Sequence, residues 1–365
     1  MWSIMTDSLG KGPLTYERYL RITEMLELQI GNKETAAEGD ELHFIIVHQI
    51  FELWFRLLRS ELSWIRDAFD TEHVEEQTVA DAVRGAERCI HILHVMQEQW
   101  GVVGTLEPQG FLRFRHELGS ASGFESWQMR VFELIIGYRQ EERPDGSRPL
   151  DHLKKVAKRS PGDSVAWEHI EKELTRPSIA DVLARWLHRT PIHGSTPKDP
   201  GDKEVVAEFL EEVITSITRQ SELGFAVSKG GSSVDDEVLK ARHEATLVSA
   251  TSFFAPDGVP DRARLGLYFI ETFRDAPLLT WPQRLIDTLV RLEEGVILWR
   301  TRHARAVERI IGRRPGTGGS SGVDYLDNTT KMRAFTDLWT VRSLLAPSTL
   351  FDTEADQTYG FAIDG

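Results

Sequence analysis

Apolar residues recur at three- and four-residue steps along most of the chain, a spacing that predicts helices. The longest such pattern covers residues 41–62. One stripe of this segment comprises Phe44, His48, Phe51, Phe55, Leu58 and Leu62. A second stripe beside it comprises Ile46, Ile50, Leu53 and Leu57. Two neighbouring apolar stripes leave only a narrow polar face, so we expect this helix to lie deep inside a bundle rather than on its surface.

The same periodicity predicts the other main elements. Helical spacing covers residues 14–31, 75–100, 124–138, 281–311 and 333–345, and Gly312 is placed to cap the end of the helix at 281–311. Residues 108–123 have the pattern of a loop with short helical turns. Strand-like alternation is nearly absent and no internal repeat is visible. The pattern therefore predicts an all-α protein built as a helical bundle.

Glycine and proline mark where this pattern breaks. Residues 150–220 alternate short helical runs with Pro and Gly, and residues 229–261 contain Gly-Gly-Ser-Ser and Pro-Asp-Gly-Val-Pro. We expect a single domain over residues 1–365, with a variable region of inserted helices and loops at 145–265 that lies over an edge of the bundle. The acidic segment 348–365 is expected to be a flexible tail.

Composition narrows the class of protein. The formal net charge of −14 argues against nucleic acid or an anionic membrane as a partner, because both bind basic surfaces. The single cysteine, Cys89, allows no internal disulfide and fits a reducing compartment. The N-terminal residues lack a basic lead and a long apolar run. We therefore expect no signal peptide, no membrane span and a cytoplasmic location.

Two histidines stand on apolar stripes, where a neutral imidazole must find a partner. His48 belongs to the stripe at 41–62, and His303 shares the last long stripe with Trp299, Ala306 and Ile310. Small and apolar neighbours give His303 the room that an axial haem ligand needs. Taken alone, either residue fits the interpretation of an ordinary core histidine. His91 and His94 lie three apart on another predicted helix, where surface or packing roles are favoured over a metal pair.

The glycine-rich run 316–322 does not fit a phosphate-binding loop, because no Gly-Lys-Ser/Thr follows it and no strand precedes it. It is typical of a loop that closes over a pocket, or of a plain linker. The sequence contains no His-Glu-x-x-His for zinc and no Glu-x-x-His for a di-iron bundle, and one cysteine cannot hold an iron–sulfur cluster.

Five motifs occur in the order in which one known family carries them. They are LTYERYL at 14–20, the segment 41–62, the segment 114–126 with Phe-Arg, Leu-Gly and Ser-Gly-Phe-Glu-Ser, WRTRH at 299–303, and GTGGSSG at 316–322. Through these motifs the chain resembles the tryptophan 2,3-dioxygenase family, and the resemblance extends over residues 14–140 and 285–345.

The resemblance implies a haem b in each subunit. The haem would be bound without covalent attachment, because the sequence has no Cys-x-x-Cys-His. His303 matches the proximal iron ligand of the family, with Trp299, Arg300 and Gly318 around the cofactor. Arg300 is close enough to His303 in sequence to meet a haem propionate, although pairing elsewhere is an equal alternative.

The resemblance also assigns the substrate side of the pocket. His48 would contact the indole nitrogen of L-tryptophan or a tryptophan derivative without binding iron, and Arg115 would hold the carboxylate through two parallel hydrogen bonds. Thr317 would meet the ammonium group. The remaining wall would be formed by Phe44, Phe111, Leu118, Ser122 and Gly123. Phe111 departs from the family, since many relatives carry tyrosine there.

Tyr16 and Tyr19 match tyrosines that relatives lend to the pocket of a neighbouring subunit. The resemblance therefore implies a homo-oligomer, and the family is tetrameric. Packing within a single chain is the alternative interpretation of these two residues.

The expected reaction is cleavage of the indole C2–C3 bond of L-tryptophan by O₂, giving N-formyl-L-kynurenine. One alternative is an offshoot that inserts a single oxygen atom into tryptophan or a substituted tryptophan. Two others are a haem-based sensor without turnover and a haem-free helical scaffold. Arg115 and Thr317 together favour an enzyme, because a sensor has no use for groups that hold an amino acid.

Overall fold

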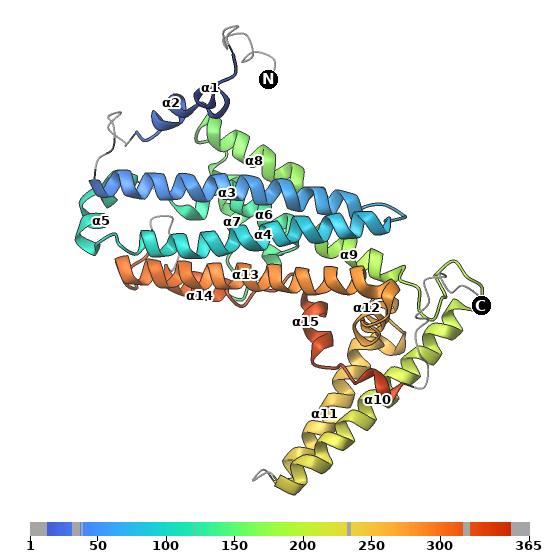
Figure 1. The fold of residues 1–365 in the computed structure, drawn as a ribbon. Coiled ribbons are helices and arrows are strands. Elements are labelled where there is room, and N and C mark those ends of the chain that lie inside the picture. Colours follow the sequence, from blue (N-terminus) through green and yellow to red (C-terminus); the bar gives the residue numbers. More distant parts are fainter. Residues whose placement is uncertain are drawn as a thin grey trace.

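The computed structural model describes residues 13–30, 37, 39–119, 121–231, 235–316 and 322–351. At its centre lie three long helices, α3 (Gly39–Phe69), α4 (Glu76–Val103) and α13 (Thr280–Ile311), which run side by side (Figure 1). The shorter α6 (Trp127–Ile136) packs against α3. The described residues contain helices and isolated β-bridge residues but no strand, which confirms the all-α prediction for this part of the chain.

The helix predicted at 41–62 is confirmed as part of α3, but only one of its two apolar stripes is buried. Phe51, Phe55, Leu58 and Leu62 lie in the core, where α4 and α6 cover them. The second stripe is exposed, with 38% of Ile46 and 58% of Leu53 accessible to solvent. The prediction that α3 lies deep inside the bundle was therefore wrong. No other element of the described chain covers this face of α3 enough to bury it.

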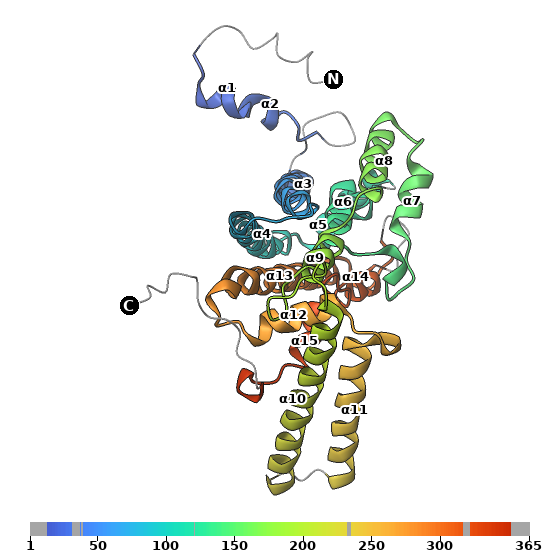
Figure 2. The same ribbon diagram turned by 90° about the vertical axis from the view of Figure 1, so that its right-hand side faces the viewer.

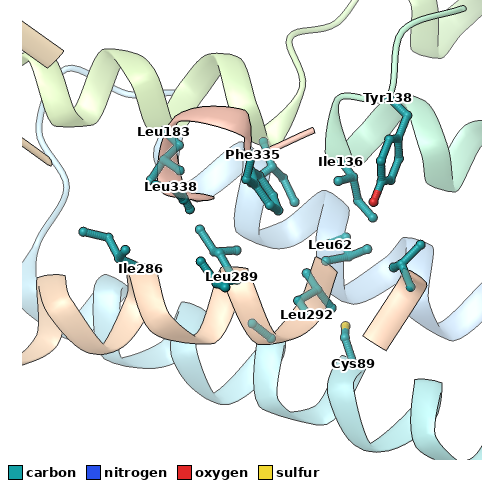
Figure 3. Close-up of a cluster of buried hydrophobic side chains, with 14 of the residues drawn as sticks. Leu62, Cys89, Ile136, Tyr138, Leu183, Ile286, Leu289, Leu292, Phe335 and Leu338 are labelled. Atoms are coloured by element: carbon teal, nitrogen blue, oxygen red, sulfur yellow. The ribbon is translucent and has the colours of Figure 1, made fainter. Parts of the chain in front are cut away.

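The core is tightest between α4 and α13, which share the most extensive contact in the molecule. Gly295 on α13 allows this approach, because a Cβ atom at that position would lie 3.2 Å from Cδ1 of Leu93 on α4. Figure 3 shows Cys89, Leu62, Leu292 and Ile136 meeting in this core. Close packing of α4 and α13 fixes the position of the last turns of α13, which carry His303.

The N-terminal segment forms two short helices instead of the single helix predicted at 14–31. These are α1 (Tyr16–Leu20) and α2 (Ile22–Leu26), and neither contains a buried residue. Arg21 separates them with a left-handed backbone conformation, φ 53°. A non-glycine residue in that conformation interrupts the helix, so the segment bends there.

The region at 145–265 contributes both to the bundle and to a projection from it. Its first helices are α7 (Pro149–Val156), α8 (Pro161–Leu174) and α9 (Ile179–His188), followed later by α12 (Arg262–Thr272). Between them, α10 (Asp202–Gly231) and α11 (Asp236–Phe254) form a hairpin that projects from the bundle (Figures 1 and 2). The prediction of only short helical runs up to residue 220 was wrong at α10.

The remaining elements are short. They comprise α5 (Pro108–Phe114), α14 (Val323–Thr329), α15 (Thr336–Arg342), η1 (Arg115–Leu118), η2 (Gly123–Glu125), η3 (Gln140–Glu142), η4 (Pro256–Gly258), η5 (Pro277–Leu279) and η6 (Ser348–Leu350). The sequence pattern missed α14. Phe351 is buried against Tyr268 and Phe273, and residues 352–365 of the expected tail lie outside the described residues. Within the described residues, no helix has the length and apolar character needed to cross a membrane.

Candidate functional site

His48 lies on the buried side of α3 and is surrounded by aromatic rings. Its ring centroid is 4.0 Å from that of Phe44 and 6.5 Å from that of Phe51. Nδ1 lies 2.7 Å from the carbonyl oxygen of Phe44, one helical turn earlier. A carbonyl can only accept, so Nδ1 carries the proton and donates it, and Nε2 of the neutral ring presents a lone pair.

His303 lies near the end of α13, where its ring stacks on Trp100 of α4. The two ring centroids are 4.3 Å apart and the planes differ by 8°. Trp299, one turn earlier on α13, lies 5.6 Å from His303 and 5.9 Å from Trp100. Neither ring nitrogen of His303 has a hydrogen-bond partner among the described residues. The ring is therefore positioned by packing alone and keeps a nitrogen free for a ligand.

A continuous set of rings links the two histidines. Phe51 of α3 lies 4.6 Å from Trp100 and 6.2 Å from Trp299, measured between ring centroids. Burial lowers the pKa of His48, and burial lowers the pKa of His303 to about 3, with smaller contributions from His48 and Arg130. Both imidazoles are therefore neutral near pH 7, which is the form that can bind a metal or accept a hydrogen bond.

The residues around His303 fit a haem. The indole nitrogens of Trp100 and Trp299 are buried without a hydrogen-bond partner. Burying an unpaired donor lowers the free energy of unfolding, so such groups are rare in a protein core. A neutral imidazole with a free nitrogen, among flat apolar rings, suits axial ligation of haem iron. His303 is the residue that would hold the iron, and Trp299 and Trp100 would lie beside the cofactor.

The predicted substrate wall follows directly after α4. Phe111 of α5 is buried, with its ring 5.7 Å from that of Phe44, so the structure brings these two predicted residues together. Leu118 of η1 is partly buried against the core. Ser122 caps η2 by accepting a hydrogen bond from the backbone nitrogen of Phe124, and Gly123 has open space around it. Because Phe111 has no hydroxyl group, its side chain cannot donate a hydrogen bond into the pocket.

Arg115 bridges this wall to the segment that precedes the glycine-rich loop. Its Nη2 donates to the carbonyl oxygen of Pro315 at 2.8 Å. At the far end of the loop, Gly322 has φ 65° and lies so close to Arg314 that a Cβ atom would be 2.5 Å from its carbonyl oxygen. The two ends of the loop therefore meet next to Arg115. The predicted residues Thr317 and Gly318 lie outside the described residues.

Three predicted residues lie apart from this cluster. Tyr16 and Tyr19 are 74% and 71% exposed on α1, and no side-chain hydrogen bond or ring contact joins them to another described site residue. Arg300 is buried, and its terminal nitrogens donate to Glu133 at 2.8 Å and to the carbonyl oxygen of Thr329 at 3.0 Å. A contact between Arg300 and a haem propionate therefore stays a prediction, and it would have to use one of the three N–H groups of that side chain that these bonds leave.

Other candidates carry no comparable arrangement. His91 and His94 are exposed, with ring centroids 6.5 Å apart, and no group of three or more His, Cys, Asp or Glu in the described chain is arranged to hold a metal ion. A cavity of about 380 Å³ lies between α9, α12 and α15, and none of the predicted site residues lines it.

The sequence analysis missed two parts of the site. Trp100 stacks on His303 but had been assigned only as the end of a helix, although it continues the apolar stripe through Leu93 and Met96. Glu133, which binds Arg300, was also missed. Its spacing from Arg130 on one helix was the available signal, because residues three apart on a helix are neighbours.

Comparisons with known proteins identify the family of the chain. Residues 5–345 match the family model described as tryptophan 2,3-dioxygenase. The chain is 38% identical to a tryptophan 2,3-dioxygenase of Sorangium cellulosum, covering 96% of this chain and 88% of the relative. It is also 38% identical to tryptophan 2,3-dioxygenase 2 of Ralstonia nicotianae, covering 91% of this chain and 93% of the relative.

A third relative is named differently. A tryptophan 2,3-dioxygenase-like protein of Xanthomonas campestris is 37% identical, covering 70% of this chain and 97% of the relative. The family model and the first two relatives each cover most of the chain, including both histidine-bearing helices. On this evidence the chain belongs to the tryptophan 2,3-dioxygenase family, a family of haem dioxygenases.

Proposed function

We propose that this protein is a haem b-dependent dioxygenase that cleaves the indole C2–C3 bond of L-tryptophan with O₂, producing N-formyl-L-kynurenine. One observation carries the proposal. Two neutral, largely buried imidazoles, His48 on α3 and His303 on α13, are linked through Phe51 and Trp100 in a single aromatic cluster. Only one of them, His303, leaves both ring nitrogens without a hydrogen bond in the described chain. That asymmetry supports one iron ligand and one group that acts on substrate.

His303 would be the protein ligand of the iron. Its ring is held by stacking on Trp100, so it needs no hydrogen bond to keep its orientation. The haem supplies the O₂ chemistry of the reaction when it is bound. The protein contributes binding, orientation of the substrate and the exclusion of water from an aromatic pocket.

His48 would orient the indole. Because Nδ1 donates to Phe44, Nε2 is left to accept a hydrogen bond from the indole N–H of tryptophan. Phe44 and Phe111 supply apolar surface for the ring, with Leu118, Ser122 and Gly123 continuing the wall. These side chains fix the position of the C2–C3 bond while the amino-acid end is held elsewhere.

The amino-acid end of the substrate would be held by two residues on different segments. Arg115 would bind the carboxylate, exchanging its bond to Pro315 for a charge-assisted pair. Thr317 would meet the ammonium group. A guanidinium presents two parallel donors to a carboxylate, whereas a lysine ammonium is a single point charge.

A homo-oligomer, tetrameric as in the family, would complete the pocket. In the part of the chain that the structure describes, Tyr16 and Tyr19 are largely exposed, and so is the α3 stripe of Ile46, Ile50 and Leu53. Unpartnered apolar surface of this kind is typical of an interface between subunits. Tyr16 and Tyr19 would then reach the pocket of a neighbouring subunit.

A second candidate function is a mono-oxygenase acting on tryptophan or a substituted tryptophan. Phe111 favours it, because this buried side chain brings no hydroxyl to the pocket wall where many relatives have tyrosine. Loss of this hydroxyl group changes how the substrate or product is hydrogen-bonded, and it would therefore alter the balance between dioxygenation and mono-oxygenation.

One experiment separates these functions. The protein is purified after haem-supplemented expression, its Soret band is recorded, and L-tryptophan and O₂ are added to the ferrous form. The dioxygenase predicts a product that carries both atoms of ¹⁸O₂ and an opened indole ring. A product with a single ¹⁸O supports the mono-oxygenase. A haem-bound protein without turnover supports a sensor, and the absence of a Soret band supports a haem-free scaffold.

A further inference from the structure

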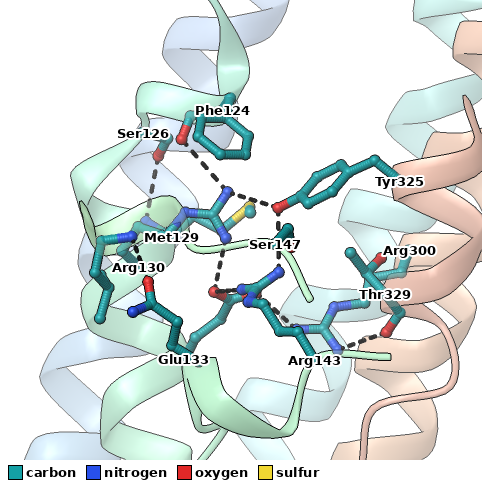
Figure 4. A network of polar contacts seen from close by, with 12 residues as sticks. Phe124, Ser126, Met129, Arg130, Glu133, Arg143, Ser147, Arg300, Tyr325 and Thr329 are labelled. Carbon is teal, nitrogen blue, oxygen red and sulfur yellow. Dashed lines mark hydrogen bonds and ion pairs between the residues drawn. The ribbon is translucent and has the colours of Figure 1, made fainter. Parts of the chain in front are cut away.

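We infer that Glu133 is a positioning residue for the haem site, holding the helix that carries His303 and setting the electrostatic field around it. The inference rests on the proposed function, since it concerns the haem that His303 would bind. It arises from a buried cluster of charges that the substrate and ligand assignments leave unused. Figure 4 shows this cluster, with Glu133 between three arginines.

The carboxylate of Glu133 is shared by three guanidinium groups. Oε2 accepts from Arg130 and from Arg143, each at 2.7 Å, and Oε1 accepts from Arg300 at 2.8 Å. The hydroxyl of Tyr325 lies 3.2 Å from Arg143 and 3.4 Å from Arg130. All four charged side chains are buried. The arrangement is therefore a fixed network rather than a set of mobile surface pairs.

The network carries an excess of positive charge. Among the described residues, Glu133 is the one carboxylate that contacts Arg130, Arg143 or Arg300. Counted over these direct contacts, three guanidiniums and one carboxylate leave two positive units. A second buried carboxylate, Glu293, lies close to Tyr138, the ring that Arg300 covers. Nε of Arg130 is in addition buried without a partner. An unbalanced charge is weakly screened in a protein interior, so its field extends to neighbouring groups.

This field reaches the histidine that would bind iron. Arg300 precedes His303 by three residues on α13, so the two lie within one helical turn. Arg130 and Arg143 bind the same carboxylate as Arg300, so their charges lie in the same part of the core. Positive charge near a haem favours its ferrous form, because reduction adds a negative charge. Glu133 supplies the one negative charge of the network, so it moderates this effect.

The same carboxylate links three parts of the site mechanically. Glu133 stands on α6, which begins directly after the wall formed by Ser122 and Gly123. Arg300 stands on the helix of His303. Tyr325 stands on α14, which begins where the glycine-rich loop ends. Glu133 therefore joins the helix that follows the substrate wall to the ligand helix, and Tyr325 joins the same network from α14 through Arg143 and Arg130.

Glu133 is also expected to stabilise the fold, and a purely structural role must be separated from an electrostatic one. Two substitutions with opposite charge effects achieve this. Glu133→Gln removes the negative charge at constant shape, whereas Arg143→Gln removes one positive charge from the same network. Asp202→Asn is the matched control, because Asp202 forms a buried bidentate pair with Arg262 at the base of the α10–α11 hairpin.

The measurement is the Fe(III)/Fe(II) reduction potential of each haem-loaded protein, together with its thermal stability. Glu133→Gln is expected to shift the equilibrium toward ferrous haem by about tenfold, which corresponds to about 59 mV for one electron. Arg143→Gln is expected to shift it in the opposite direction. Asp202→Asn is expected to lower the melting temperature and leave the potential unchanged.

Each outcome decides the question. Potentials that stay within the range of wild type and Asp202→Asn, or that shift in the same direction for both cluster variants, would overturn the inference. If Glu133→Gln fails to retain haem, the sign of the shift in Arg143→Gln decides alone. Wild-type protein without haem would overturn the proposed function as well. Wild type with haem and turnover but without the opposite shifts would overturn the inference only.

Discussion

At the scale of single residues, the same side-chain type has two different surroundings at the two ends of the aromatic cluster. His48 is fixed by a hydrogen bond to its own helix, which decides its tautomer and leaves Nε2 as an acceptor. His303 has no such bond in the described chain and is fixed by stacking on Trp100. A group that must accept from an indole needs the first arrangement, and a group that must bind iron can use the second.

Arg115 provides the sharpest test of the amino-acid substrate. Arg115→Leu removes the guanidinium that would hold the carboxylate, and a hydrogen bond to a charged group contributes about 1.5–3 kcal/mol. We therefore expect kcat/KM for L-tryptophan to fall by about ten- to more than a hundredfold, at about 1.4 kcal/mol per decade. Haem content should be unchanged. Steady-state kinetics and the Soret absorbance measure the two quantities.

Two controls accompany Arg115→Leu. Arg113→Leu removes a guanidinium two residues earlier, in the last turn of α5, one that pairs with Asp40 at 2.9 Å, and it should leave kcat/KM close to wild type. Tryptamine lacks the carboxylate, so wild type should use it poorly and Arg115→Leu should lose little more on it. Equal losses on tryptophan and tryptamine would show that Arg115 does not hold the carboxylate.

The lowered pKa of His303 makes the stability of the haem-free protein depend on pH. Its folded pKa of about 3 lies below the unfolded value, so the unfolded chain binds the extra proton between these two values. The free energy of unfolding should therefore fall as pH decreases from about 6.5, by at most about 1.4 kcal/mol per pH unit from this group. Urea titrations between pH 7 and pH 5 should show a smaller slope in His303→Gln. Equal slopes would mean that His303 is not buried neutral.

At the scale of elements, apolar periodicity predicted the long helices of the bundle and placed His48 and His303 on their apolar stripes. Periodicity identifies an apolar face but not the element that covers it. The stripe through Ile50 and Leu53 was therefore predicted to be buried, whereas it is exposed in the single chain. Periodicity also underestimated α10, whose buried stripe of Phe209, Val213 and Ile217 follows a segment rich in Pro and Gly. Glu133 was missed because a charged residue in an amphipathic pattern usually faces solvent.

The contact between α12 and α9 depends on a glycine. A Cβ atom at Gly266 would lie 2.4 Å from the carbonyl oxygen of Leu187, which is backbone and cannot easily move. Gly266→Ala should therefore lower the free energy of unfolding by about 1–3 kcal/mol. Gly224→Ala, on an exposed turn of α10 with no atom within 4 Å of the new Cβ, should raise it by about 0.5–1 kcal/mol. Chemical denaturation compares the two, and equal effects would contradict the packing argument.

At the scale of the whole molecule, the described part of a single chain leaves two apolar surfaces uncovered. The helices α1 and α2 bury no residue, and one face of α3 stays in solvent. Both become intelligible if each N-terminal segment packs on another subunit. The folded chain would then contain a pocket and a donor segment, but not a pocket completed by its own segment.

Complementation between two inactive variants tests this arrangement. The first variant carries Tyr16→Ala and Tyr19→Ala, so its donor segment is defective and its pocket is intact. The second carries Arg115→Leu, so its pocket is defective and its donor segment is intact. Each homo-oligomer should have low activity. In a mixed oligomer, an intact pocket can meet an intact segment from its neighbour.

Co-expression of the two variants should therefore restore activity that neither shows alone. If segments are exchanged between pairs of subunits and the variants mix at random, about a quarter of the wild-type activity per haem should return. The active fraction should co-migrate with the oligomer on size-exclusion chromatography. If Tyr16 and Tyr19 serve the pocket of their own chain, every pocket in the mixture stays defective, and activity remains at the average of the two variants.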